Sequence, residues 1–443
     1  MADFIFYFYS MQEDYLHYLW EFQKWKNLKL LTSEGLAVKV ISPGRHNHLS
    51  GPDFFNSRLL IGEQEWAGNV EIHINASDWY LHGHETDPAY DNVILHVVWN
   101  HDADIFRGDN AEVPVLELQR FVPEQALRSY RELLSKDKAR WINCEKDFPN
   151  FDDFALDNWL ERLYLERLEQ KAGFVFRLLE GSSNDWEKVL FVLLARNFGL
   201  NVNGDAFFSI ANSIPFQVAG KLRKHQKQLE ALLLGQAGLL EKQVQEPYYI
   251  ELKQEFDYLT KKFGLSREGI TPVKYFRLRP DNFPEIRLSQ FAAVYHEQSS
   301  LFSKVISAQN IEVLKKLFSA GVFEFWETHY TFQKPHRKRK KLLSPAFVEL
   351  LIINTLIPLK FCYMKAMGEE REEQLLTLVT NLQKEDNKII KKYNSIRPGT
   401  AENAMQSQAL LQLKKEYCEK NRCLHCALGV KVLQETQVNS VNL

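Results

Sequence analysis

The sequence predicts an α/β domain over residues 1–144, followed by a large all-α domain over residues 145–443. Before about residue 124, short apolar runs rich in β-branched residues alternate with turn residues, which is typical of strands. After that point nearly every segment has apolar residues at helical spacing. With 443 residues, of which 45% are hydrophobic, the chain is long enough for two or three domains with substantial cores.

The first domain is expected to contain a helix over residues 11–31 and then a sheet built around a hairpin. The run VILHVVW is apolar at almost every position, which predicts a central strand buried on both faces. Pro114 places the last strand at an edge, because proline cannot donate to the ladder. Strands are expected over residues 35–41, 54–61, 66–74, 93–99 and 113–118, and helices of the second domain over residues 153–178, 186–198, 216–234, 248–263, 289–302 and 346–367.

Charge is distributed unevenly along the chain. Residues 1–144 carry 13 Lys and Arg against 21 Asp and Glu, whereas the whole chain carries 55 against 57. An acidic part that binds metal and a basic part that binds phosphates would suit an enzyme acting on nucleic acid. Two differently solvated surfaces would explain the same numbers equally well.

The N-terminal segment is apolar but lacks a basic region and is too short to span a bilayer, so no signal peptide or membrane helix is expected. Five cysteines in 443 residues do not form a disulfide framework. We therefore expect reduced thiols and a cytoplasmic protein.

A metal site is expected at the hairpin. Asp53 follows the turn Gly51-Pro52, and Glu71 and His73 are two residues apart on a strand, so their side chains leave the same face. Carboxylate oxygens suit Mg²⁺ or Mn²⁺, and imidazole suits borderline metals. Asp53, Glu71 and His73 are therefore the expected ligands and catalytic residues. The alternative is an ordinary hairpin with acidic residues at its surface.

Seven of the thirteen histidines fall in one region, namely His46, His48, His73, His82, His84, His96 and His101. His82 and His84, together with Asn69, are expected to support the metal ligands. His96, inside an apolar strand, is expected to be a hydrogen-bonded core residue, and His101 a turn residue. A histidine-rich zinc or iron hydrolase site is the alternative chemistry, although no helical H-x-x-x-H pair is present.

Two further clusters lie in the second domain. The run 334–341 has six Lys or Arg in eight positions, and a nucleic-acid backbone is the expected partner of Arg337, Lys338, Arg339, Lys340 and Lys341. Such a run is otherwise a solvated loop. Cys418, Cys423 and Cys426 have the spacing of ligands to Zn²⁺ or an iron–sulfur cluster, with Cys144 expected as the fourth ligand. The alternative is a helical hairpin with free thiols.

The hairpin resembles the core of the PD-(D/E)XK nuclease superfamily, in which an Asp after a turn and an acid-x-Lys on the next strand hold the catalytic metal. The resemblance implies a restriction-endonuclease-like mixed sheet, with His73 standing where that superfamily usually has Lys. Some of its members carry one cysteine near the core and three near the C-terminus around a four-iron cluster. Here the first cysteine follows the core and does not precede it.

Longer motifs resemble a bacterial family of unknown function, family 2851, from about residue 11 to the C-terminus. They are HYLW (17–20), GPDF (51–54), GNVEIHINASDWYLHGH (68–84), YDNVILHVVW (90–99), LLARNFGLNVNGD (193–205), RPDNFPEIRLSQ (279–290) and YCEKNRCLHCALG (417–429). The expected function is divalent-metal-dependent hydrolysis of phosphodiester bonds in nucleic acid. The alternatives are an inactive nuclease-like module that binds nucleic acid or serves as a scaffold, and a histidine-dependent hydrolase of small phosphorylated substrates.

Overall fold

The computed structural model describes residues 12–25, 29–47, 49–134, 140–369 and 372–438. The chain forms two compact units, one made of residues 1–156 and 413–443 and the other of residues 157–412. The first unit holds a mixed sheet and the second is almost entirely helical. The expected boundary is at residue 144, and residues 413–443 of the expected second domain belong to the first unit.

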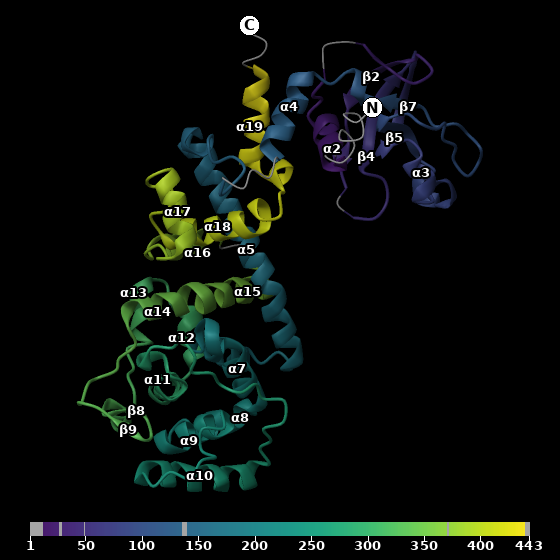
Figure 1. Ribbon diagram of the computed structural model, residues 1–443. Coiled ribbons are helices and arrows are strands. Elements are labelled where there is room, and N and C mark those ends of the chain that lie inside the picture. Colours follow the sequence, from purple (N-terminus) through teal and green to yellow (C-terminus); the bar gives the residue numbers. More distant parts are fainter. Residues whose placement is uncertain (1–11, 26–28, 48, 135–139, 370–371, 439–443) are drawn as a thin grey trace. The chain divides into compact units, whose positions relative to one another are not determined.

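The sheet of the first unit has seven strands and joins antiparallel and parallel neighbours (Figure 1). The order is β1-β2-β4-β5-β6-β7, and β3 also pairs with β4; pairs as far as β5 are antiparallel, whereas β5-β6-β7 run parallel. The bounds are β1 Leu30–Leu31, β2 Ala37–Ser42, β3 Arg45–His46, β4 Phe54–Ile61, β5 Gln64–Asn75, β6 Val93–Asn100 and β7 Val115–Glu117.

The expected hairpin is confirmed as β4 and β5, which join through a turn in which Gly62 adopts a left-handed conformation with φ 62°. The expected central strand is confirmed as β6, whose residues are buried along all but the last position. One register shift interrupts β4 between Phe54 and Ser57, where Asn56 has φ 58°. This irregularity changes the pairing just after Asp53, at the end of β4 that faces the second half of β5.

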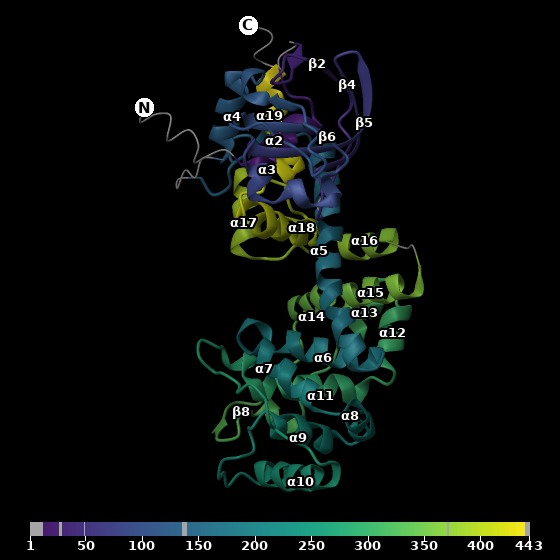
Figure 2. The same ribbon diagram turned by 90° about the vertical axis from the view of Figure 1, so that its right-hand side faces the viewer.

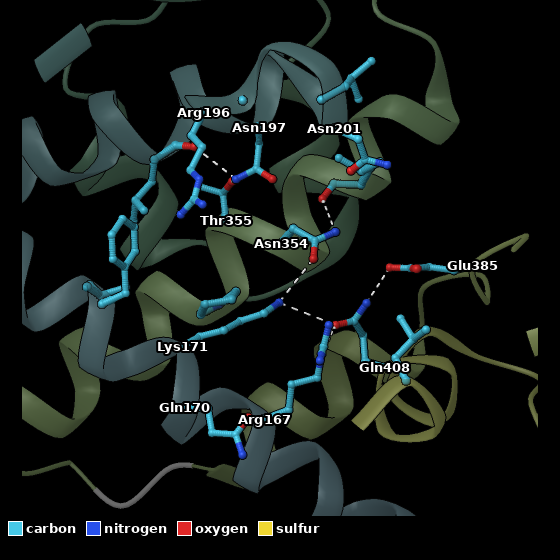
Figure 3. Close-up of a pocket in the computed structure, with 18 of the residues that line it drawn as sticks. Arg167, Gln170, Lys171, Arg196, Asn197, Asn201, Asn354, Thr355, Glu385 and Gln408 are labelled. Atoms are coloured by element: carbon cyan, nitrogen blue, oxygen red, sulfur yellow. Dashed lines mark hydrogen bonds between the residues drawn. The ribbon is translucent and has the colours of Figure 1, made fainter. Parts of the chain in front are cut away.

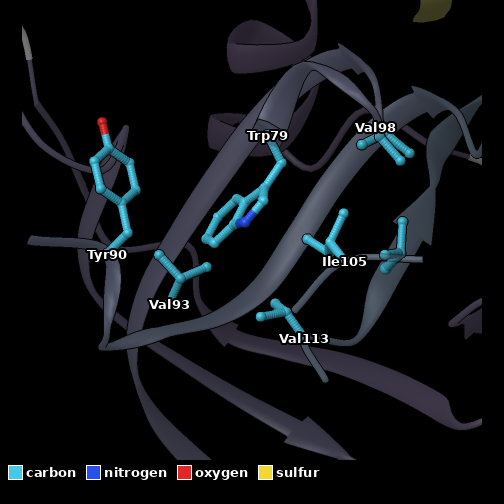
Figure 4. Close-up of a cluster of buried hydrophobic side chains, with 8 residues drawn as sticks. Trp79, Tyr90, Val93, Val98, Ile105 and Val113 are labelled. Carbon is cyan, nitrogen blue, oxygen red and sulfur yellow. The ribbon is translucent and has the colours of Figure 1, made fainter. Parts of the chain in front are cut away.

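A buried cluster beside β6 fixes the segment that follows β5 (Figure 4). Trp79, on the short helix α3 (Asp78–Leu81), is fully buried and donates from Nε1 to the carbonyl of Phe106 at 3.2 Å. The cluster consists of Ala76, Trp79, Tyr90, Val93, Val98, Ile105, Val113 and Val115. Trp79 thus anchors the segment that carries His82 and His84.

Two helical segments complete the first unit. Helix α2 (Glu13–Glu21) buries its apolar face, and Nε1 of Trp20 donates to the carbonyl of Pro43 at 3.0 Å. It covers less of the chain than the expected helix over residues 11–31, part of which lies outside the described residues. The C-terminal helix α19 (Ala427–Val438) lies beside α4 (Glu124–Leu134), as both ribbon views show (Figures 1 and 2).

The second unit is a stack of helices (Figure 2). Two expected helices are each divided: residues 216–234 form α8 and α9 around a turn, and residues 289–302 form parts of α11 and α12, with Ser300 left-handed at φ 52° between them. The bounds are α5 Asp153–Gly181, α6 Trp186–Phe198, α7 Leu200–Ser213, α8 Phe216–Leu222, α9 Gln226–Gln236, α10 Pro247–Phe263, α11 Pro284–Glu297, α12 Leu301–Ser307, α13 Ile311–Lys316, α14 Pro345–Leu351, α15 Ile357–Met367, α16 Glu372–Thr380, α17 Lys388–Ile396 and α18 Ala404–Gln412.

Residues Pro345–Met367 form one continuous apolar helical stretch, in which a π-helical turn, η7 (Ile352–Leu356), joins α14 to α15. Among the described residues this is the one helix long and apolar enough to cross a bilayer by length and composition, and 72% of its most apolar window is buried inside the protein. A second π-helical turn, η8 (Leu413–Cys418), follows α18 and leads to the C-terminal cysteines.

Candidate metal centre

The second half of β5 carries Glu71 and His73 on one face, and both are buried, with 4% and 2% of their surfaces exposed. Nε2 of His73 lies 3.4 Å from Oε1 of Glu71. Asp53, immediately before β4, donates from its backbone N–H to Oε2 of Glu71 at 3.1 Å. The three residues that the sequence singled out therefore lie side by side.

His82 and His84 join this group because of the turn between them. Gly83 adopts the left-handed conformation with φ 72°, which is energetically unfavourable for a residue with a side chain. Nδ1 of His82 then lies 3.1 Å from Nε2 of His73, and Nε2 of His84 lies 3.3 Å from Oε1 of Glu71. One ring nitrogen from each of the three histidines lies within 4.8 Å of the other two. We call His73, His82, His84 and Glu71 the histidine cluster.

The cluster extends from the interior to the surface. His73 and Glu71 are buried and His84 is half-buried, whereas His82 is exposed. Tyr90 stacks on the ring of His84 with a centroid distance of 3.7 Å, and Trp79 meets that ring edge-on at 5.4 Å. The position of His84 is therefore set by aromatic packing, while His82 faces solvent.

His96 contacts the ring nitrogen of His73 that points away from the histidine cluster. It is fully buried on β6, opposite Glu71 in the parallel ladder, and its Nε2 lies 2.8 Å from Nδ1 of His73. If Nδ1 of His73 carries the proton and donates to His96, then Nε2 of His73 keeps a lone pair directed at the cluster. His96 is thus the expected core residue, and it also orients a candidate ligand.

Asp53 is held by partners on two elements. Its Oδ2 accepts from the backbone N–H of Ile72 at 3.0 Å and lies 3.2 Å from Nε2 of His17, on helix α2. His17 was not predicted from the sequence. One sequence feature could have indicated it: His17 follows Glu13 by four residues in a helix, so the two side chains lie on the same face.

Burial and neighbouring charges shift the pKa values of the cluster. Burial, together with the charge of Asp53, raises the pKa of Glu71 to about 9. Burial, together with His84 and His82, lowers the pKa of His73 to about 3. At neutral pH without a metal, the Glu71 carboxyl is therefore protonated and His73 is neutral, and their contact is a hydrogen bond between neutral groups. Burial also opposes protonation of His17, but the hydrogen bond and charge of Asp53 outweigh it and raise its pKa.

Three imidazole nitrogens and a carboxylate oxygen are a donor set that suits Zn²⁺, Fe²⁺ or Mn²⁺ better than Mg²⁺, which prefers oxygen ligands. The ring nitrogens of the expected supporting residues His82 and His84 are thus close enough to that of His73 for all three to hold one ion. Asn69 does not join them: its Oδ1 accepts from the backbone N–H of Asn56 at 3.3 Å, at the irregularity in β4. Asn69 therefore stabilises the local backbone of the hairpin.

The remaining histidines of the region lie elsewhere. His46 stacks on Phe54 at 4.8 Å, and His101 lies near the carboxylate of Asp104 at 3.4 Å, in keeping with a turn residue. His48 lies outside the described residues.

A family model described as a protein of unknown function (DUF2851) matches residues 13–388. The chain belongs to the DUF2851 family. Comparisons with curated proteins and with solved structures found no match. The family match contains the whole histidine cluster and ends before Cys418, so the sequence resemblance expected over the C-terminal motif is not part of it.

The DUF2851 chain brings four of its five cysteines to one place. A small cavity in the first unit is lined by Cys144, Cys418, Cys423 and Cys426, together with Ile142, Asn143, Leu413, Tyr417, Leu428 and Gly429. Nδ2 of Asn143 lies 3.2 Å from Sγ of Cys423. Burial raises the pKa of the Cys144 and Cys423 thiols. The fifth cysteine, Cys362, is buried in α15 of the second unit.

The C-terminal motif is tightly packed around this cavity. A Cβ on Gly429 would come within 2.2 Å of the carbonyl oxygen of Cys423, so glycine is required there. His425, between the second and third cysteines of the motif, does not line the cavity and pairs with Asp14 of α2 at 3.3 Å. The four cysteines are therefore the candidate donors at this cavity, and His425 links the C-terminal motif to α2.

The basic run is only partly available to a phosphate backbone. Lys341 is buried, with 5% exposed, and its ammonium donates to the carbonyls of Trp326 and His329. The prediction that Lys341 contacts nucleic acid is wrong, because its side chain points into the protein. Arg339 pairs with Asp281, and Lys338 lies near two glutamates, Glu324 and Glu327. Arg337 and Lys340 are exposed.

Proposed function

We propose that this protein is a divalent-metal-dependent hydrolase that cleaves phosphodiester bonds in nucleic acid. One observation carries the proposal: three histidine ring nitrogens gather within 4.8 Å of one another, beside the buried carboxyl of Glu71. Glu71 and His73 are the buried members of this set, and burying polar groups is costly unless their polar atoms are satisfied, which a bound ion would do.

We further propose that the sheet is a variant of the restriction-endonuclease-like fold. Asp53 precedes β4, and Glu71-x-His73 lies on the next, antiparallel strand, which is the order of acid and acid-x-Lys in the PD-(D/E)XK superfamily. His73 then takes the place of the Lys. A neutral imidazole cannot replace the fixed charge of Lys, but it can hold a metal. This substitution accounts for the two further histidines beside it.

His73, His82, His84 and Glu71 would hold the ion, with His96 fixing the ring of His73. When bound, a divalent ion lowers the pKa of a coordinated water and polarises a phosphate oxygen. The donor set favours Mn²⁺, Zn²⁺ or Fe²⁺. Because Glu71 carries a proton at neutral pH in the metal-free protein, binding an ion requires that proton to leave.

Asp53 and His17 are the groups we assign to proton transfer. Their side chains are 3.2 Å apart, and the pKa of His17 is raised, so the imidazolium persists to a higher pH than usual. An imidazolium beside a carboxylate is suited to donate a proton to the leaving oxygen of a phosphodiester, while the carboxylate holds the ring in place. His82 is exposed, so a polymeric substrate would reach the ion from this side of the cluster.

We propose that the four cysteines hold a Zn²⁺ ion or an iron–sulfur cluster with a structural role. Four thiol donors around one small cavity fit either group, and no charged side chain lines that cavity. Cys144 lies near the end of the first segment of this unit and the other three lie in its C-terminal segment, so a bound group would connect these two segments.

The test is a cleavage assay on single-stranded and duplex DNA and RNA with Mn²⁺, using protein purified without oxygen. The expected result is Mn²⁺-dependent cleavage that falls to background in Glu71→Ala and persists in Glu65→Ala, which removes an exposed acid from the same strand. Salt-sensitive binding without cleavage would favour an inactive nucleic-acid-binding module. Cleavage of small phosphodiesters alone would favour the second candidate, a histidine-dependent hydrolase of small phosphorylated substrates. The three histidine nitrogens of the donor set are the observation that favours this candidate.

A further inference from the structure

The second unit contains a large polar cavity that the proposed hydrolase does not use (Figure 3). Its volume is about 860 Å³, in the range of small-molecule sites. Helices α5, α6, α7 and α18 form much of the wall. The π-helical turn η7 contributes Asn354 and Thr355, and such turns are frequent at functional sites because they redirect side chains at some cost to the helix.

Positive charge is concentrated on one side of this cavity. Arg167 and Lys171 are one helical turn apart on α5, and Figure 3 shows both reaching towards Gln408. Nε of Arg167 donates to Oε1 of Gln408 at 2.7 Å, and Nζ of Lys171 lies 3.5 Å from the same oxygen. Two basic side chains therefore share one amide oxygen.

An acid that also lines the cavity, Glu385, lies on the other side of that amide. Gln408 is buried and its Nε2 donates to Glu385, which fixes the amide so that its oxygen faces the cations. Nζ of Lys171 also donates to Oδ1 of Asn354 at 3.2 Å. Within the part of the chain that the structure describes, Lys171 forms no ion pair. A desolvated ammonium held by amide oxygens is poorly compensated, and an anion in the cavity would compensate it.

The charge state of Lys171 reflects this environment. Burial and the neighbouring Arg167 lower its pKa to about 7, against a smaller opposing effect of Glu385. Near pH 8 most of the Lys171 amine is therefore neutral in the free protein. An anion bound beside it would favour the ammonium, so binding would take up a proton.

The rest of the wall offers an apolar surface next to the cations. Phe174, Leu193 and Leu411 line it, and Arg196, paired with Asp205 at 3.5 Å, lies over the ring of Phe174. A ligand with an anionic group and a flat or apolar body would contact both sides. We propose that this cavity binds a small phosphorylated molecule, with its phosphate at Arg167 and Lys171 and its body against the apolar wall.

The test is isothermal titration of the full-length protein with adenosine monophosphate, inorganic phosphate and adenosine at pH 7.5–8.5, where a phosphate monoester is already a dianion. The expected result is binding of the monophosphate, with proton uptake seen as a dependence of the heat on the ionisation enthalpy of the buffer. Phosphate binding with the same proton uptake also supports the proposal and shows that the anion is the part recognised. Adenosine binding as tightly as its monophosphate would overturn it, as would no binding of any of the three probes at millimolar concentration.

A variant pair separates recognition from folding. Lys171→Met keeps the length of the side chain and removes a poorly compensated buried charge, so it should leave stability unchanged or raise it. It should weaken binding of the monophosphate about ten- to hundredfold, the effect of losing a charge-assisted hydrogen bond, and abolish proton uptake. Lys221→Met changes an exposed lysine of α8 and should alter neither. Equal binding by wild type and Lys171→Met would contradict the proposal.

Discussion

The protonation state of Glu71 gives the sharpest prediction for the histidine cluster. An ion can bind to Glu71 only after the carboxyl loses its proton, whereas His73, with a pKa of about 3, is already neutral. At pH 7 the carboxyl is about two pH units below its pKa of about 9, so its deprotonation costs about 3 kcal/mol of the free energy of metal binding. This cost falls as the pH rises.

The apparent affinity for Mn²⁺ should therefore increase almost tenfold from pH 7 to pH 8, and about twenty-five-fold from pH 7 to pH 8.5, where the slope falls as the pH approaches the pKa. Free Mn²⁺ is measured by electron paramagnetic resonance under anaerobic conditions, and Mn²⁺ is chosen because thiolates bind it poorly. Glu71→Gln removes the carboxyl and should bind more weakly at pH 8.5 and with a much smaller slope.

Glu65→Gln, on the same strand but exposed and paired with Arg58, is the matched control and should keep the wild-type slope. A flat wild-type profile over this range would refute the reasoning, since it would mean that no proton leaves Glu71 when the ion binds. A steep profile retained by Glu71→Gln would also refute it, because the proton would then come from another group.

Three further predictions concern the surroundings of the two sites. His96→Leu keeps an apolar side chain in the core but releases Nδ1 of His73, and should weaken Mn²⁺ binding about ten- to hundredfold while circular dichroism shows an intact fold; unchanged affinity would exclude the orienting role. Gly83→Ala places a side chain at φ 72° and should lower the free energy of unfolding by about 1–2 kcal/mol in urea titrations, whereas Gly181→Ala, at a helix end with open space around it, should have little effect. Cys423→Ser should lose the zinc or iron found by metal analysis, and Cys362→Ser, outside the cysteine cavity, should retain it; retention in both would show that the cysteines hold no metal.

Much of the sheet could be predicted because its signals are local. Alternation along β4 and β5 and the unbroken apolar run of β6 follow from which faces are buried, and the two-residue spacing of Glu71 and His73 places them together on any strand. The grouping of Cys144 with the three C-terminal cysteines follows from ligand chemistry and not from a local pattern. Three cysteines at ligand spacing require a fourth donor, and the chain has few candidates.

The parts that sequence reasoning missed depend on tertiary placement. The sequence predicts His82 and His84 as supporting residues but does not show that their ring nitrogens lie beside that of His73. That proximity depends on the left-handed Gly83 and on the anchoring of Trp79, and neither can be read from the H-x-H spacing. His17 reaches Asp53 only because α2 packs on the sheet. Lys341 is buried although its neighbours in the basic run are exposed, since a charge run in sequence does not define which side chains turn inward.

The central claim is that the histidine cluster binds one catalytic divalent ion. The most direct test is an anomalous-difference map at the manganese edge from crystals of the full-length protein grown with Mn²⁺. The account predicts one strong peak in contact with Nε2 of His73, Nδ1 of His82, Nε2 of His84 and a carboxylate oxygen of Glu71. A map without a peak at this position, from crystals in which the cluster is well ordered and at pH 8 or above, would contradict it.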